Sequence, residues 1–334
     1  MADYILSCCS TVDTSVEWCN ERDISYIYFN YQLDGVALKD DFGKTNPPDQ
    51  LYAKMLAGAD AKTSQVAVGE YIVYFREFLE AGKDILHLSL DSGISGTVES
   101  ARMAQEQLAP EFPDRTIAIV DSMTATAGYA LLMDELARQR SAGVGFSELC
   151  EQANMLRAQV HLWFESSDLT FFIRGGRISK ASGILGGMLN ICPIMDIEPD
   201  GTLAVKAKVR TKRKALAFLV DTMEKECIGG RDYARKVYVA HSECKSDAEA
   251  LVIMLKERFP KLDGEVPIFS VGATCPRRGP GKRAPEGTTK AAGTRERAEE
   301  RTEAHGSVSF DKNLLELEAP RSSMSSRDLH YGTH

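Results

Sequence analysis

Short apolar runs and amphipathic segments follow one another along the first half of the chain. Near-continuous apolar runs are typical of strands buried in a parallel sheet, whereas apolar residues three or four positions apart are typical of helices. Strands are predicted at 4–10, 24–29, 85–90 and 116–120. Helices are predicted over 50–56, 68–79, 97–108 and 129–138. This repeated order of strand, polar loop and helix predicts an α/β fold in which helices cover a parallel sheet.

The second half of the chain, from about residue 156, has a more mixed pattern. Further elements are predicted as strands at 160–166, 236–241 and 266–271 and as helices over 213–226 and 248–259. Pro199, Asp200 and Gly201, which lie between two apolar runs, predict a hairpin. We therefore expect two α/β domains, one over 1–155 and the other over 156–273.

The composition changes at about residue 274. From there to residue 334, the 11 Lys/Arg and 9 Asp/Glu residues outnumber the eight large apolar side chains. Such a segment buries too little apolar surface to offset the entropy lost on ordering. The atypical tail 274–334 is therefore predicted to be disordered.

The chain of 334 residues, with 43% hydrophobic and 26% charged residues, is long enough for two substantial cores. Its net charge of −8 argues against nucleic acid as a partner, because nucleic-acid-binding domains carry basic surfaces. The first residues lack the pattern of a secretory signal, and the uncharged run 181–195 contains glycine, asparagine and proline. We expect a cytoplasmic monomer without stable membrane insertion.

Eight cysteines are present, but none forms a CxxC pair and no cysteine or histidine cluster has zinc spacing. They are interpreted as reduced structural thiols. No spacing groups a nucleophile with a base and an acid, so no catalytic residue, metal site or cofactor is predicted. His87, inside an apolar strand, is interpreted as a structural residue of the sheet.

The stretch DSGISGTVESA at 91–101 lies at the junction of a predicted strand and a predicted helix. Gly93 would allow the backbone to approach a ligand closely, and Ser92 and Ser95 would add hydroxyl donors beside the unpaired N–H groups of the helix terminus. Together these groups would form a small anion site. Ordinary helix capping by Ser95 is the other interpretation, and the local sequence leaves both open.

Two further stretches contain candidate ligand contacts. Thr63, in KTSQ at 62–65, could donate to the same ligand or cap a helix. Arg174 and Arg177 flank a Gly-Gly turn and would suit a phosphate or carboxylate clamp, although exposed charges at a turn often contribute little. The loop 121–128 is interpreted as structural.

Taken in order, these stretches resemble the DegV family of bacterial fatty-acid-binding proteins. The matching pieces are STVD at 10–13, KTSQ at 62–65, DSGISGT with ESA at 91–101, the loop at 121–128, and RGGRIS with the later ICPI and DGTL stretches. Their order and spacing agree over about residues 4–273.

The resemblance implies two α/β domains with a fatty acid between them, its acyl chain in a tunnel and its carboxylate held by a threonine, a serine and a histidine. Thr63 and Ser92 match the threonine and the serine. The resemblance further implies a carrier rather than an enzyme, with a long-chain fatty acid as ligand and a separate fatty acid kinase as partner. Arg174 and Arg177 are similar to residues implicated in that partnership.

The sequence departs from the family pattern at two places. Asp91 stands where a serine is often found, and its side chain is expected to point away because two carboxylates repel each other. The segment 279–281 retains Gly-Pro-Gly, but Arg277 and Arg278 stand where the histidine would lie, which makes Arg277 a candidate replacement. A shifted reading frame and a divergent terminus would each explain the break, and both remain open.

Two other functions are consistent with the sequence. One is an α/β enzyme that acts on a phosphorylated metabolite through the strand-end loops and the two arginines. The other is a regulatory protein whose ligand only changes its binding to a partner. Turnover without a partner would indicate the enzyme, whereas a co-purified fatty acid would indicate the carrier.

Overall fold

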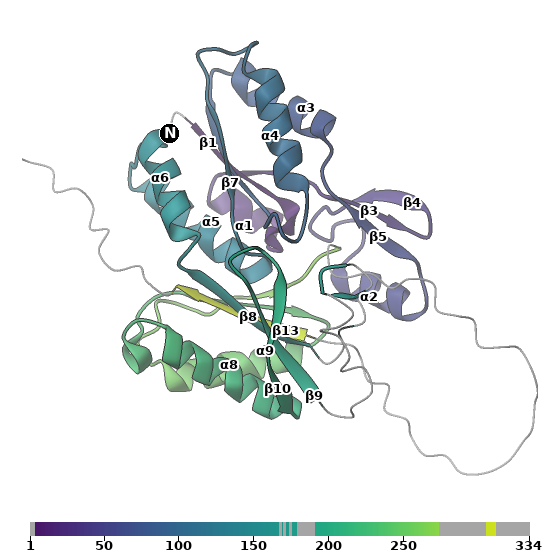
Figure 1. Ribbon diagram of the computed structural model, residues 1–334, viewed down its shortest axis with the longest axis vertical. Coiled ribbons are helices and arrows are strands. Elements are labelled where there is room, and N and C mark those ends of the chain that lie inside the picture. The colour runs from purple at the N-terminus through teal and green to yellow at the C-terminus, as the bar shows by residue number, and fades with distance from the viewer. Residues whose placement is uncertain are drawn as a thin grey trace, which may run out of the picture.

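The computed structural model describes residues 4–166, 169, 172–173, 176–178, 191–273 and 305–311. Within them, two large sheets are stacked, with one sheet and its helices above the other (Figure 1). The predicted domain boundary at 155/156 falls at the end of α6 (Phe146–Leu156), just before the first strand of the second sheet. None of the described helices combines the length and hydropathy that a membrane crossing requires.

The first sheet is parallel throughout, as the sequence predicted. Its strand order is β2 (Ile24–Ile27), β1 (Tyr4–Cys9), β6 (Asp84–Ser89) and β7 (Ile117–Asp121). One face packs against α3 (Val68–Glu80) and α4 (Thr97–Leu108), and the other against α1 (Val16–Glu21), α5 (Thr126–Ser141) and α6. Because both faces are covered, the strands are apolar on both sides.

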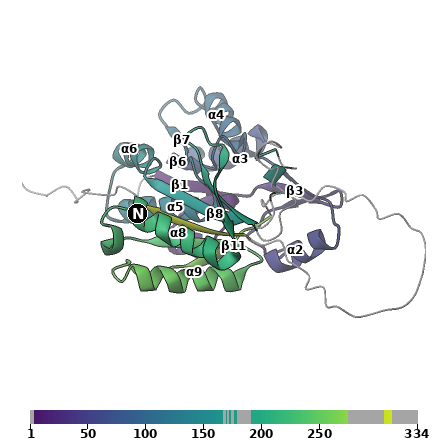
Figure 2. The same cartoon turned by 60° about the horizontal axis from the view of Figure 1, so that its bottom comes forward.

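Helix α5 lies between the two sheets (Figure 2). It packs beneath the first sheet and also contacts β8, β11 and β13 of the second. Its buried residues are distributed around most of its circumference, as expected for a helix enclosed on all sides. The two halves of the protein therefore share a continuous core.

A small antiparallel sheet was not predicted from the sequence. Its strand order is β4 (Val36–Lys39), β3 (Asn30–Leu33) and β5 (Ala61–Ser64), and α2 (Pro48–Leu56) lies between β4 and β5 in the chain. Asp34 and Gly35 connect β3 to β4 with φ values of 51° and 83°. Two consecutive positive φ values are typical of the tightest hairpin turns, for which Asp-Gly is a favoured sequence. This sheet places Thr63 on β5.

The second sheet is mixed and contains the predicted hairpin. Its strand order is β10 (Leu203–Arg210), β9 (Ile191–Ile197), β8 (Val160–Ser166), β13 (His305–Asp311), β11 (Val237–Ser242) and β12 (Ile268–Ser270). Helices α8 (Lys212–Glu226) and α9 (Lys245–Arg258) pack on the face away from α5. Two single-turn 3-10 helices, η1 (Ser10–Val12) and η2 (Gly230–Asp232), complete the described elements.

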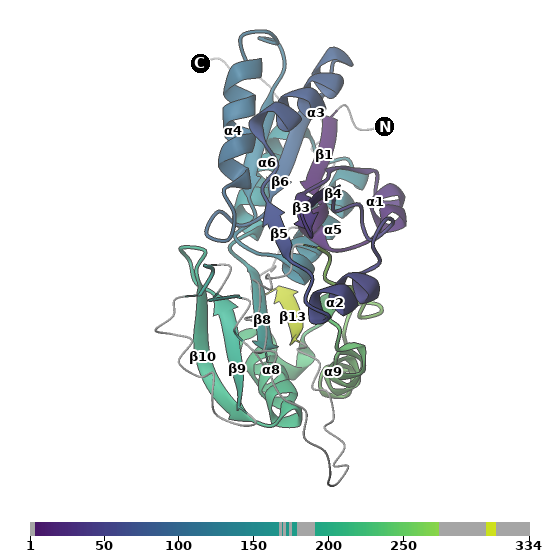
Figure 3. The ribbon, with the colours of Figure 1, turned by 90° about the vertical axis from the view of Figure 1, so that its right-hand side faces the viewer.

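Strand β13 corrects the prediction that the whole segment 274–334 is disordered. Residues 305–311 lie between β8 and β11 and pair with both in antiparallel register (Figure 3). Seven residues need few apolar side chains to join a sheet, because neighbouring strands supply hydrogen-bond partners for their backbone groups. Composition alone therefore underestimated the order of this stretch.

Candidate functional site

A cavity of about 450 Å³ lies between the two sheets, at the carboxyl ends of the parallel strands. Ligands of open α/β sheets bind at this edge, and the volume is within the range of small-molecule sites. Three strand-end loops contribute residues to the lining: Thr11 and Asp13 after β1, Leu90 and Ile94–Gly96 after β6, and Ala125 and Thr126 after β7. The site therefore uses the loops that the strand, loop and helix order brings to one edge.

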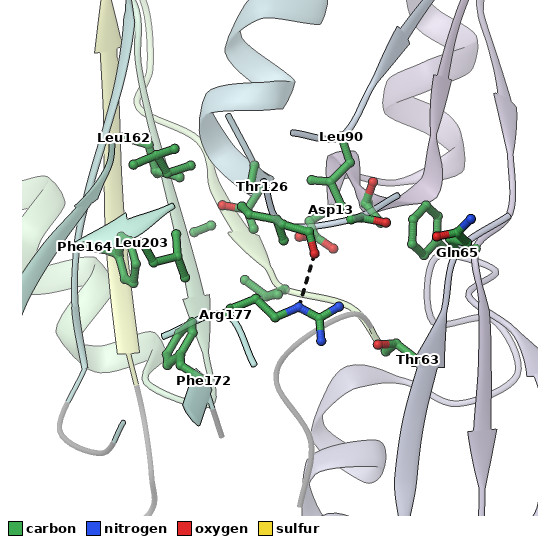
Figure 4. A pocket seen from close by; sticks show the side chains of 18 of the residues that line it. Asp13, Thr63, Gln65, Leu90, Thr126, Leu162, Phe164, Phe172, Arg177 and Leu203 are labelled. Atoms are coloured by element: carbon green, nitrogen blue, oxygen red, sulfur yellow. Dashed lines mark hydrogen bonds between the residues drawn. The ribbon is translucent and has the colours of Figure 1, made fainter. Parts of the chain in front are cut away.

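The two walls of the cavity differ in polarity (Figure 4). The wall formed by the first half of the chain carries most of the polar residues, which lie beside Phe29, Leu90, Ile94 and Ala125. These polar residues are Thr11, Asp13, Thr63, Ser64, Gln65, Ser95 and Thr126. The opposite wall includes the apolar residues Leu162, Phe164, Phe172, Ile197 and Leu203. Such a cavity fits an elongated amphipathic molecule with a polar head and an apolar body.

Two helices begin at the polar wall. Gly96 is the N-cap of α4 and Ala125 is the N-cap of α5, and both residues line the cavity. Neither N-cap residue makes a side-chain cap bond, although Ser95 Oγ accepts the Thr97 N–H at the start of α4 at 3.3 Å. The N-terminus of a helix carries a partial positive charge and unpaired N–H groups, so both helices favour an anionic group at this wall.

Thr126, the first residue of α5, has a φ of 45°. A β-branched residue rarely adopts positive φ, and such strain is concentrated at functional sites. The sequence favours a structural interpretation of the loop 121–128, and the structure adds that Ala125 and Thr126 at its end line the cavity. The position of the loop after a strand of the parallel sheet was the available signal.

Of the candidate residues, Thr63, Ser95 and Arg177 line the cavity. Arg177 donates a hydrogen bond from Nε to the Ile94 carbonyl at 3.2 Å. Arg174 and Arg277 lie outside the described residues. The three candidates that line the cavity come from segments that are far apart in the sequence, and the fold brings them together.

Ser92 and Gly93, in contrast, are not among the lining residues. Ser92 is exposed, and its backbone N–H donates to Asp121 Oδ1 at 3.2 Å. Asp91 is buried and its Oδ1 accepts the Gly93 N–H at 2.8 Å, which turns this end of the loop away from the cavity. Of the two serines that the sequence suggested in this motif, Ser95 therefore lies at the cavity and Ser92 lies outside its lining.

Gly93 allows a close contact with the second half of the chain. A Cβ atom at Gly93 would lie 2.3 Å from the Gly201 carbonyl carbon, in the turn between β9 and β10. Ile197 and Leu203, on either side of that turn, line the cavity. The glycine thus allows the β9–β10 hairpin to close against the 91–96 loop.

Gly93→Ala is expected to lower the free energy of unfolding by about 1–3 kcal/mol, the usual cost of inserting an atom into a packed site. The added methyl group would clash with backbone atoms of Gly201, and only a movement of the β9–β10 hairpin can remove this clash. Urea denaturation measures the effect. Gly69→Ala in α3 is the matched control, because no atom lies within 4 Å of its Cβ position and alanine favours helix. Equal stability of Gly93→Ala and the wild type would contradict the close packing.

The structure assigns the histidines of the described region to places away from the cavity lining. His87 is fully buried in β6, and its Nδ1 lies 2.9 Å from Ser7 Oγ, which confirms the structural interpretation. His161 lies near Glu226, and His241 Nε2 lies 3.4 Å from Ser270 Oγ. Among the described residues, no cluster of His, Cys, Asp and Glu could hold a metal ion.

The fold and the cavity define the class as an α/β protein with a cavity between its two large sheets. A family model described as "Uncharacterised protein, DegV family" matches residues 9–276. The chain is 29% identical over 263 residues to a DegV domain-containing protein of Clostridium perfringens, covering 79% of this chain and 90% of the relative. The chain therefore belongs to the DegV family.

Solved structures show the same fold. The structure titled "Fatty Acid Binding of a DegV family Protein from Thermus thermophilus" has a TM-score of 0.75 at 22% identity, covering 92% of this chain and 99% of the other. The Streptococcus pneumoniae Fatty Acid Kinase (Fak) B3 protein, loaded with linoleic acid, has a TM-score of 0.72 at 19% identity and covers 94% and 100%.

Proposed function

We propose that this protein binds a long-chain fatty acid, with the carboxylate at the polar wall of the cavity and the acyl chain along the apolar wall. The observation that carries the proposal is the division of a single cavity into these two walls. The Thermus and Streptococcus structures, whose titles name fatty acid binding and bound linoleic acid, support the same ligand class. An apolar wall of this extent would suit a sugar phosphate poorly.

The acyl chain supplies most of the binding free energy in this proposal. Each buried methylene contributes about 0.8 kcal/mol, and a hydrogen bond to a charged carboxylate contributes about 1.5–3 kcal/mol. Thr63 and Ser95 are the proposed hydroxyl donors, the N-termini of α4 and α5 stabilise the negative charge, and Arg177 adds a cation. The contacts of the carboxylate therefore determine which end of the fatty acid lies at the polar wall.

We further propose that the protein acts as a carrier and presents the acid to a separate fatty acid kinase, rather than catalysing a reaction itself. The likeness to the Fak B3 protein supports this role. In the test, the loaded protein is incubated with ATP, with and without a fatty acid kinase. Acyl phosphate is expected only when the kinase is present, and formation of acyl phosphate by this protein alone would indicate an enzyme.

Replacing both Thr63 and Ser95 with alanine is expected to weaken fatty acid binding by 10-fold or more, since loss of about 1.4 kcal/mol corresponds to tenfold. Titration with a fluorescent fatty acid measures the affinity, and mass spectrometry of the purified wild type is expected to show a co-purified fatty acid. Ser92→Ala is the matched control from the same loop and should bind like the wild type. Unchanged affinity in the double variant would reject these two donors.

A further inference from the structure

Asp13 is an acidic side chain on the wall that we propose receives a carboxylate. It follows η1 at the end of β1, has a φ of 53°, and is only 4% exposed. Its Oδ1 accepts the Gly272 N–H at 2.9 Å. Its Oδ2 is buried and has no hydrogen-bond partner among the described residues. A buried polar atom without a partner is costly, so this oxygen would gain from a hydrogen bond to a group bound in the cavity that Asp13 lines.

Thr11 has the same property. Its Oγ1 is buried, it has no hydrogen-bond partner in the described part of the chain, and the residue lines the same cavity. Two unpartnered polar atoms, two residues apart, therefore lie at one end of the polar wall. Both would be satisfied by a single polar head group that can accept hydrogen bonds.

The surroundings of Asp13 favour its neutral form. Asp40, after β4, is also 4% exposed, and its two oxygens accept hydrogen bonds from Ser10 Oγ at 3.0 Å and from the Ala273 N–H at 3.4 Å. Burial, and then the neighbouring Asp40 carboxylate, hold the pKa of Asp13 well above its usual range. Burial also raises the pKa of Asp40 to about 6. The surroundings therefore favour the protonated form of Asp13, which has an unpartnered oxygen, and the Asp40 carboxyl accepts two hydrogen bonds that favour its ionised form.

The other charged groups near this end of the cavity do not reverse the preference of Asp13 for its protonated form. Arg177 extends from the second half of the chain and donates to the Ile94 carbonyl, and it is not among the groups that shift the pKa of Asp13. The first turn of α5, which packs against η1, contains no acidic residue. Lys62, next to Thr63 on β5, is exposed and pairs with Asp60 at 2.5 Å. Among the described residues, Asp40 is therefore the charged group that most affects the pKa of Asp13.

We infer that neutral Asp13 donates a hydrogen bond from Oδ2 to the carboxylate of the bound acid, so that one proton is shared between the protein and its ligand. The inference rests on the proposed function, because it requires an acid as ligand. The proton remains between two oxygen atoms and no covalent bond other than O–H is involved. Two ionised carboxylates cannot share this buried site without strong repulsion, so ionisation of Asp13 should expel the acid.

The test compares the affinity for dodecanoate, below its micelle concentration, of the wild type and Asp13→Asn from pH 5.5 to 9.5. Asparagine keeps an N–H donor at all pH values, whereas Asp13 loses its donor on ionisation. The ratio of the wild-type Kd to the variant Kd is expected to be constant at low pH and then to rise about tenfold per pH unit. Titration of the ligand itself affects both proteins equally and cancels in the ratio.

Two controls separate the shared proton from a structural role of Asp13. Asp40→Asn removes the neighbouring negative charge, so the pH at which affinity begins to fall should move downward. Dodecanol lacks the carboxylate, and its affinity should not depend on pH in either protein. Calorimetry of the wild type in two buffers of different ionisation enthalpy, above the pH at which affinity falls, should show uptake of about one proton per acid bound.

A constant Kd ratio together with no proton uptake would overturn the shared proton while leaving the carrier function intact. Failure of the wild type to bind dodecanoate or any longer acid at every pH would reject the carrier function, and the shared proton with it. Because the buffer comparison uses the wild type alone, the inference remains testable if Asp13→Asn does not fold.

Discussion

Val308→Pro is expected to separate the second sheet into two parts and to lower the free energy of unfolding by about 2–4 kcal/mol. Val308 is in the middle of β13, where it pairs with Trp163 of β8 and Val239 of β11. Proline has no N–H and is found in sheets almost only at edges or bulges. The loss combines one hydrogen bond of about 1 kcal/mol with an interior carbonyl left without a donor, at about 1–3 kcal/mol.

The location of β13 explains why Val308→Pro should destabilise the whole second sheet and not only the seven residues of this strand. The strands β10, β9 and β8 are on one side of β13, and β11 and β12 are on the other. Among the described strands, no other connects these two groups. Hydrogen exchange of the β8 and β11 amides, together with urea denaturation, is the appropriate measurement, because these amides should become accessible when β13 is displaced.

Val308→Ala is the matched control, since it shortens the same side chain and keeps the backbone N–H. It should remain clearly more stable than the proline variant. If the two variants have the same stability and the same exchange rates, β13 does not hold the sheet together. Such a result would restore the interpretation of the whole 274–334 segment as a disordered tail.

Local patterns were sufficient for most of the first half of the fold. Helix α4 occupies 97–108 as predicted, because its apolar periodicity and its glycine-containing start are both local features. The parallel sheet followed from the alternation of strands and helices. Strand β13 could not be predicted in this way, because its partners are more than 60 residues away in the chain and its composition is that of a polar segment.

The candidate site was only partly predictable, because contacts between distant segments of the chain place some of its residues. The sequence pointed to the loop after β6 and to both of its serines, Ser92 and Ser95, of which only Ser95 lines the cavity. The close contact of Gly93 with Gly201, a hairpin residue more than 100 positions away, could not be predicted from the local motif. Asp13 and Thr126 could have been chosen from their positions after strands of the parallel sheet, which is a topological signal rather than a motif.

His87 is expected to make the protein less stable in acid through its own titration. Burial lowers the pKa of this histidine to about 3 in the folded protein, whereas the pKa of an unfolded histidine is about 6.5. Between these values the unfolded chain binds more protons than the folded one. The free energy of unfolding therefore falls as the pH falls, by about 1.4 kcal/mol per pH unit and by about 3 kcal/mol between pH 7 and pH 4.

His87→Gln isolates this contribution, because glutamine retains polar atoms near Ser7 and Tyr71 but does not titrate. The measurement is the difference in unfolding free energy between wild type and variant, from urea denaturation at pH 4, 5, 6 and 7. Burial raises the pKa values of Asp40 and Asp91 to about 6 and 7, so these groups stabilise the fold below those values and lose that effect as the pH rises. They are present in both proteins, so their opposite pH dependence cancels in the difference. The difference should decrease steadily toward pH 4, and a constant difference would show that His87 takes up its proton in the folded state at an ordinary pH.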